Sequence, residues 1–121
     1  MQVTTEKYSS KSDLSIDQCI RDCLVSFQAC SGCLPHCLDM GGKHADKGHI
    51  GLLIECAEMC RMSASLMLAK SQFSHEHCQL CARVCDLCAA SCESVDADDE
   101  MMAQCAEACR RSADSCRSMS H

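Results

Sequence analysis

The sequence is poor in the residues that usually fill a protein core. Its 121 residues include no tryptophan, one tyrosine, two phenylalanines and a single proline. It has few β-branched residues and no stretch of alternating apolar residues, so strands are not expected. No apolar run approaches the roughly 20 residues that a membrane-spanning helix needs. We therefore predict a protein of the all-α class that does not cross a membrane.

The charge balance and the first residues narrow the range of partners. The net charge is −6 at pH 7. An acidic chain with almost no aromatic residues is a poor candidate for binding nucleic acid or an anionic membrane. Residues 1–14 lack the apolar core of a signal peptide. We therefore expect a cytoplasmic protein, in a compartment where thiols stay reduced.

Metal-binding side chains are abundant. The chain contains fifteen cysteines, eight methionines and six histidines. All three residue types bind metals, and the sulfur ligands of cysteine and methionine select soft ions.

Breaks in the pattern divide the chain into four helical segments. Gly41 and Gly42 interrupt it once, and polar stretches interrupt it near 71–74 and 94–99. Ser74 is a predicted N-cap, and the aspartates before the last segment suit a helix N-terminus. We expect a flexible segment over 1–12 and a single four-helix bundle domain over 13–119. The predicted helices span 13–41, 45–71, 75–94 and 98–119.

The cysteines follow helical spacing. In the third segment the gaps between them are 3, 4, 3 and 4, which is the spacing of the inner face of a bundle helix. Ser26 and Ser112 occupy positions that the stripes of the first and fourth helices skip, and Leu53, Ser63 and Met67 extend the stripe of the second. Short connections favour antiparallel neighbours. We therefore predict an antiparallel four-helix bundle with a core lined by Cys19, Cys23, Cys30, Cys33, Cys37, Cys56, Cys60, Cys78, Cys81, Cys85, Cys88, Cys92, Cys105, Cys109 and Cys116.

Two simple explanations fit this pattern poorly. Leucine or alanine would pack as well as cysteine without the risk of oxidation, so fifteen cysteines are more than packing needs. Cysteines one helical turn apart have Cβ atoms about 5–6 Å apart, whereas a disulfide needs about 3.5–4.5 Å. Disulfides between helices remain possible, but the stripes do not require them.

Binding of many Cu(I) ions fits the spacing best. Cu(I) accepts two or three thiolates and is selected by their softness, so pairs such as Cys19/Cys23 and Cys85/Cys88 are predicted sites. Zinc prefers closed groups of four ligands, and the cysteine run of a ferredoxin is absent. We predict a store that buffers and detoxifies copper and is not an enzyme. The alternatives are a zinc or cadmium buffer of the metallothionein type and a thiol redox protein.

The two ends of the predicted bundle differ. We expect ions to enter at one end, through His36, Met40, His49 and Met102, with the last three pointing inward. The other end gathers apolar side chains into a predicted plug: Ile16, Leu66, Met67, Phe73 and Met119. His75 and His77, at the same end, are predicted to be surface residues.

The chain resembles the cytosolic branch of the bacterial copper storage proteins. The segments that carry the resemblance are CIRDC (19–23), CSGCLPHC (30–37), ECAEMC (55–60), CQLCARVCDLCAASC (78–92) and QCAEACRRSADSCRSM (104–119). The resemblance implies a homotetramer of four-helix bundles that takes up Cu(I) through one open end, roughly one ion per cysteine. Members often have further cysteines where this chain has Ser26, His49, Met102 and Ser112. The sequence identifies no copper chaperone as a partner.

Overall fold

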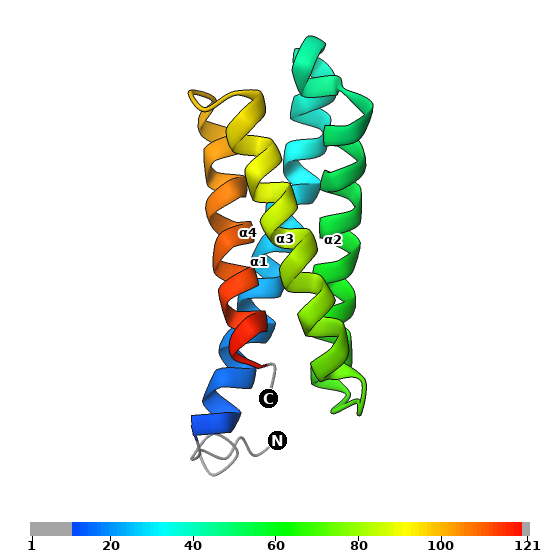
Figure 1. Cartoon of the computed structure of the whole chain (residues 1–121), viewed down its shortest axis with the longest axis vertical. Helices are drawn as coiled ribbons and strands as arrows, with labels where there is room; N and C mark the ends of the chain where they lie inside the picture. Colours follow the sequence, from blue (N-terminus) through cyan, green and yellow to red (C-terminus); the bar gives the residue numbers. More distant parts are fainter. Residues whose placement is uncertain (1–10, 120–121) are drawn as a thin grey trace, which may run out of the picture.

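The computed structural model describes residues 11–119, which form four long helices and one short 3-10 helix (Figure 1). The prediction of four helices is confirmed, with boundaries shifted by a few residues. Residues 1–10 of the predicted flexible segment lie outside the described part, and Lys11 already begins a helix. The elements are α1 (Lys11–Met40), η2 (Gly42–Ala45), α2 (Lys47–Leu68), α3 (Ser74–Val95) and α4 (Glu100–Ser118).

The first connection contains more structure than expected. Gly41 and Gly42 have φ angles of 69° and 56°, in the left-handed region that glycine adopts most easily. They end α1 and turn the chain into η2, so residue 45 belongs to a separate turn and not to the second long helix. Asp46 then caps α2, because its side chain accepts a hydrogen bond from the backbone N–H of Gly48 at 3.1 Å.

Of the two helix caps predicted for the last two helices, one is correct and one is wrong. Asp99 caps α4 by accepting a hydrogen bond from the backbone N–H of Met102 at 3.0 Å, as the aspartates predicted. Ser74 is not the N-cap of α3, because the helix already begins at Ser74 and Phe73 occupies the capping position. The hydroxyl of Ser71 instead accepts from the N–H of Phe73 at 3.0 Å, which stabilises the turn before the helix.

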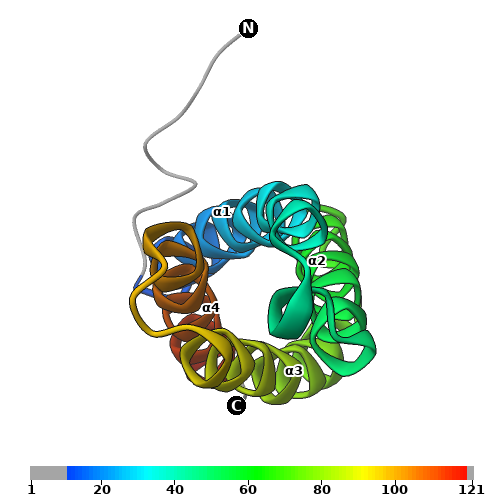
Figure 2. The same ribbon diagram turned by 90° about the horizontal axis from the view of Figure 1, so that it is seen from above.

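The four helices form a closed antiparallel bundle. Each helix packs against two others: α1 against α2 and α4, and α3 against the same two. Viewed along the bundle, the helices surround a common axis and η2 lies at one end (Figure 2). The predicted antiparallel four-helix bundle is therefore confirmed. Within residues 11–119, every helix is too short or too polar to span a lipid bilayer.

The core consists mainly of small side chains. All fifteen cysteines are at most 1% exposed, and Ser26, Ser63 and Ser112 are buried with them. Alanines such as Ala89 and Ala113 lie among these buried residues, and the larger buried apolar side chains are those of Leu53, Met67 and Met102. A core of this kind buries less apolar surface than a leucine core of the same length. Its few large side chains should therefore contribute strongly to stability.

Leu53→Ala should lower the free energy of unfolding of the reduced, metal-free protein by about 2–5 kcal/mol, because it leaves a cavity in a core with little material to fill it. Anaerobic urea unfolding followed by circular dichroism measures the change. Leu68→Ala is the matched control, since Leu68 ends the same helix at 65% exposure. Its cost should stay within about 0.5 kcal/mol. Equal losses in the two variants would contradict the importance of Leu53.

Candidate metal centre

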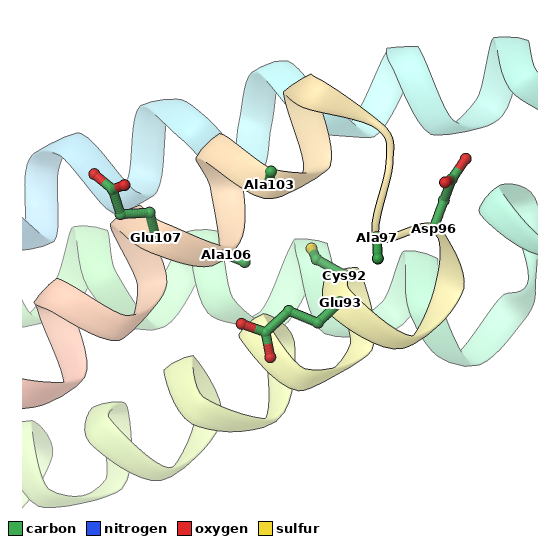
Figure 3. Close-up of a pocket in the computed structure, with 7 residues that line it drawn as sticks. All are labelled: Cys92, Glu93, Asp96, Ala97, Ala103, Ala106 and Glu107. Atoms are coloured by element: carbon green, nitrogen blue, oxygen red, sulfur yellow. The ribbon is translucent and has the colours of Figure 1, made fainter.

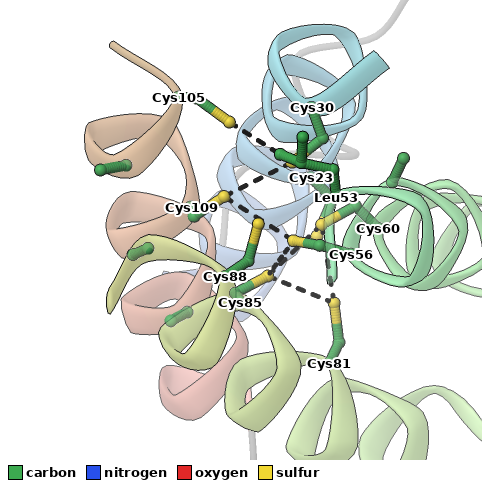
Figure 4. Close-up of a cluster of buried hydrophobic side chains, with 14 of the residues drawn as sticks. Cys23, Cys30, Leu53, Cys56, Cys60, Cys81, Cys85, Cys88, Cys105 and Cys109 are labelled. Carbon is green, nitrogen blue, oxygen red and sulfur yellow. Dashed lines mark hydrogen bonds between the residues drawn. The ribbon is translucent and has the colours of Figure 1, made fainter. Parts of the chain in front are cut away.

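The cysteine sulfurs form a continuous column along the bundle axis. Successive cysteines of α3 lie three or four residues apart, so helical geometry turns them to one face, and the other helices do the same. Figure 4 shows sulfurs from all four helices pointing toward one another in the middle of the bundle. The interior of the bundle is therefore lined with soft donor atoms that are closed off from water.

The largest group of sulfurs draws on every helix. Cys30 of α1, Cys56 of α2, Cys88 of α3 and Cys109 of α4 place their sulfurs within 4.8 Å of one another. Three smaller groups surround this quartet at the same spacing, each joining two helices: Cys19, Cys23 and Cys116; Cys56, Cys60 and Cys85; Cys88, Cys92 and Cys105. Cys56 and Cys88 each belong to two groups, so ions bound in neighbouring groups would share thiolates.

Contacts between helices extend the pairs that the sequence predicts. Two pairs of cysteines four residues apart on the same helix have their sulfurs in contact: Cys33/Cys37 on α1 at 3.7 Å and Cys81/Cys85 on α3 at 3.8 Å. Shorter sulfur–sulfur distances join different helices, such as 3.4 Å between Cys60 and Cys85. The sulfur of Cys116, on α4, lies 3.6 Å from that of Cys23 on α1. All of these distances far exceed a disulfide bond of about 2.05 Å.

Two serines interrupt the column. The Ser26 hydroxyl lies 3.3 Å from the sulfur of Cys60 and 3.7 Å from that of Cys109. The Ser112 hydroxyl lies 3.5 Å from the sulfur of Cys23 and 3.6 Å from that of Cys60. A neutral hydroxyl is a weak ligand for a soft ion, but it can accept from a thiol, as Ser26 does from Cys60, or donate to a sulfur, as Ser26 does to Cys109. Donation to a thiolate would stabilise the charge there.

Contacts between the sulfurs lower the pKa of some thiols and raise the pKa of others. Hydrogen bonds from Cys116 and Cys19 lower the pKa of Cys23 to about 5, and a hydrogen bond with Cys105 is the main cause that lowers the pKa of Cys30 to about 6. Hydrogen bonds with Cys105 and Cys109 raise the pKa of Cys88, and burial raises it further. The contacts in the metal-free column therefore favour ionisation of some thiols and oppose it at their neighbours. Binding soft cations would displace the remaining protons.

The end near η2 brings together most of the residues predicted for ion entry. His49 is buried, with Nε2 3.5 Å from the sulfur of Cys37 and Nδ1 2.8 Å from the hydroxyl of Ser91. The sulfur of Met102 lies 3.4 Å from the sulfur of Cys37. The inward placement of His49 and Met102 is confirmed. Together with Cys37 they end the sulfur column with a thioether and an imidazole.

The predicted inward placement of Met40 is wrong, because its side chain is 54% exposed. Met40 is the last residue of α1. Met102 lies in the first turn of α4 and already meets Cys37, one helical turn before Met40. Within residues 11–119, α4 therefore begins too close to Cys37 to cover Met40.

Two histidines and two carboxylates lie beyond this group, at the same end of the bundle. His36 Nε2 lies 2.7 Å from Asp99 Oδ2, and His44 Nε2 lies 3.3 Å from Asp96 Oδ2 and 3.6 Å from Asp99 Oδ2. The hydrogen bond from the N–H of Met102 and the bond with His36 lower the pKa of Asp99. The sequence placed His36 at this end but did not assign ligand roles to His44 or the aspartates. The two aspartates were predicted only as residues suited to a helix N-terminus.

The opposite end is only partly apolar. Met67 is buried and its sulfur lies 3.9 Å from that of Cys78, while Ile16, Leu66 and Met119 are half-buried. Phe73 does not contribute to a plug, because it is 57% exposed on the turn before α3. His75 and His77 are half-buried, not surface residues, since their Nδ1 atoms pair with the Met119 carbonyl at 3.2 Å and the Ser63 hydroxyl at 2.8 Å.

A small hollow opens beside the column between α3 and α4. Its volume is about 200 Å³, and Cys92 lines it together with alanines and the carboxylates of Glu93, Asp96 and Glu107 (Figure 3). Glu93 is paired with Arg110 at 2.7 Å. Cys92 is only 1% exposed, so the hollow does not give an ion open access to its sulfur.

Comparisons with known proteins agree with this architecture. The sequence model of the copper storage protein family matches residues 12–121, whereas no curated protein matches the chain. A solved structure of a protein from Nitrosospira multiformis is 38% identical, with a TM-score of 0.82; the match covers 89% of this chain and 96% of that one.

Two further solved structures carry the name of the family. The Cu(I)-bound copper storage protein BsCsp3 is 34% identical over 88% of this chain and 99% of its own, with a TM-score of 0.82. The apo form of copper storage protein 3 from Bacillus subtilis is also 34% identical, over 87% and 98%, with a TM-score of 0.77. The chain described here therefore belongs to the copper storage protein family.

Proposed function

We propose that this protein stores many Cu(I) ions as cargo in its sulfur column and so buffers and detoxifies copper. The observation that carries the proposal is the set of overlapping sulfur groups, in which Cys56 and Cys88 each belong to two groups. Cu(I) suits such a column because it accepts two or three soft thiolates and tolerates sharing. The likeness to a Cu(I)-bound relative of the same fold supports the choice of ion.

Ions would enter at the end that carries η2. Met40, exposed at the end of α1, would meet an ion first, and His36 lies at the same end, paired with Asp99. Met102 and His49 would then pass the ion to Cys37, which both of them contact. A neutral thioether and imidazole bind Cu(I) without adding charge, so they suit transfer better than permanent binding. From Cys37 onward the ion would move between thiolates and displace protons.

One observation favours zinc or cadmium as a second candidate. The quartet of Cys30, Cys56, Cys88 and Cys109 offers four sulfurs, one from each helix, which is the number of ligands that a tetrahedral ion requires. The other groups have three sulfurs each, and two of them share a member with the quartet, Cys56 or Cys88, which favours an ion of lower coordination number. We further propose that the protein acts in the cytoplasm, catalyses no reaction and binds neither nucleic acid nor membranes.

The reduced protein should take up about seven or more Cu(I) ions per chain, since fifteen thiols can supply two or more ligands to each ion. An anaerobic titration against a chromogenic Cu(I) chelator measures the capacity, and the same titration with Zn(II) tests the second candidate. Uptake of only one or two Cu(I) ions would contradict storage and favour zinc or thiol redox chemistry.

The same titration on variants tests where the ions bind. Replacing Cys85 and Cys88 by alanine removes members of three sulfur groups and should lower the Cu(I) capacity while leaving the helical circular dichroism signal largely intact. Ser112→Ala is the matched control, because it changes the same interior without removing a sulfur. Unchanged capacity in the double variant would contradict binding at the centre of the column.

His49→Ala combined with Met102→Leu should slow the initial uptake of Cu(I) several-fold, because transfer to Cys37 loses both neighbouring ligands. The final capacity should fall by no more than about one ion. Stopped-flow mixing with a Cu(I)–chelator complex measures the rate. Met101→Leu is the control, since Met101 is the exposed neighbour of Met102. Equal rates in all variants would place ion entry elsewhere.

We also propose that the chain forms a homotetramer, as the family resemblance implies. Exposed apolar side chains supply surface for such contacts, among them Leu24, Val25, Leu38, Leu80 and Leu87. Light scattering coupled to size exclusion should give about four times the 13.2 kDa of one chain. A mass near that of a single chain would contradict the tetramer.

A further inference from the structure

The end of the bundle near η2 holds a group of ligands that differs in chemistry from the sulfur column. His44, Asp96 and Asp99 place ligand atoms within 4.8 Å of one another. Imidazole nitrogen and carboxylate oxygen suit borderline divalent ions, whereas the soft Cu(I) ion prefers sulfur. We propose that His44, Asp96 and Asp99 form a binding site for a divalent transition-metal ion of the Zn(II) type, which closes the end of the copper column.

The distances match the geometry of such an ion. Ligands about 2.0–2.1 Å from a tetrahedral ion lie about 3.3–3.4 Å from each other. His44 Nε2 lies 3.3 Å from Asp96 Oδ2 and 3.6 Å from Asp99 Oδ2. The three residues place their ligand atoms within 4.8 Å of one another, so the side chains would close in around a bound ion. Water would supply the fourth ligand.

The Nε2 atom of His44 makes no hydrogen bond within residues 11–119, although carboxylate oxygens lie 3.3 and 3.6 Å away. His44 is 9% exposed, and its Nε2 is buried. Buried polar atoms in native proteins are nearly always satisfied. A cation between Nε2 and the two carboxylate oxygens would supply the missing interaction.

Backbone contacts orient both carboxylates toward His44. Asp96 accepts from the N–H of Asp98 through Oδ1, and Asp99 accepts from the N–H of Met102 through Oδ1. Each aspartate therefore uses one oxygen to stabilise the loop and presents the other, Oδ2, to His44. His36 also contacts Asp99 Oδ2, in the manner of the outer hydrogen bonds that orient metal ligands.

The site would connect the two halves of the bundle. His44 belongs to η2, between α1 and α2, whereas Asp96 and Asp99 lie in the connection between α3 and α4. Asp99 also binds the N–H of Met102, whose sulfur contacts Cys37 at the end of the column. An ion at this site would hold the halves together above Cys37 and so slow the exchange of copper.

The test uses the full chain loaded anaerobically with Cu(I), so that thiolates are occupied, and Zn(II) as the probe. We expect one tightly bound Zn(II) per chain in competition with a chromogenic zinc chelator. His44→Ala and Asp96→Asn should abolish this binding, and His36→Ala should weaken it by about 10–100-fold. Asp98→Asn and His75→Ala are matched controls, because they change the same loop and a histidine at the opposite end, and should bind Zn(II) as the parent does.

Co(II) identifies the ligands directly. Co(II) bound at this site should show weak ligand-field absorption without the intense sulfur-to-metal charge transfer of a thiolate site. No Zn(II) binding to the loaded protein, equal binding in all variants, or sulfur charge transfer would overturn the proposal and leave an ion pair between His44 and the aspartates. If the chain takes up no Cu(I), the proposed function fails, while Co(II) spectra of the metal-free protein and the same variants still test this site.

Closure of the column has its own measurement. With Zn(II) present, Cu(I) transfer to an excess of chelator should slow several-fold in the parent protein and in Asp98→Asn, but not in Asp96→Asn. Equal transfer rates with and without Zn(II) would overturn the closing role.

Discussion

The burial of cysteine on the inner face of every helix is the constraint on which the rest of this structure depends. A thiol is small and only weakly polar, so it can replace a core hydrophobe without requiring a strong hydrogen-bond partner. Once ionised it is costly to bury, unless neighbouring donors or a cation compensate the charge. Burying these residues therefore costs little free energy while most of the thiols are neutral. It becomes strongly favourable when soft cations replace the protons.

This constraint shapes the packing. Small cysteines, alanines and serines occupy the positions where most bundles place leucine, and they bring sulfurs from different helices as close as 3.4 Å. The metal-free protein then depends on a few larger side chains, among them Leu53 and Met102, for cohesion. Helix caps contribute at the ends, where Asp46 and Asp99 satisfy backbone groups that the helices leave unpaired. The bound cargo would supply much of the remaining cohesion, because ions that bind only the folded state stabilise it.

The structure also separates two kinds of ligand along one axis. Soft sulfur donors occupy the column down to Cys37 and Met102, and imidazole and carboxylate groups lie beyond them. Asp99 joins the two zones, since one of its oxygens caps α4 beside Met102 and the other faces the histidines. A residue that ends a helix can thereby orient ligands, because capping fixes its side chain at a defined place.

The sequence alone determined the stripes of cysteine, because spacings of three and four residues place side chains on one face of any helix. That spacing was enough to predict four antiparallel helices, the buried thiols, and the inward placement of His49 and Met102. It could not reveal which sulfurs of different helices meet, since the quartet of Cys30, Cys56, Cys88 and Cys109 depends on the relative height of the helices. Helix ends were the least predictable part: Met40 and Phe73 are exposed, and His77 pairs with Ser63 of the neighbouring helix. The grouping of His44 with Asp96 and Asp99 joins two connections distant in sequence, and only their packing at one end of the bundle brings these ligands together.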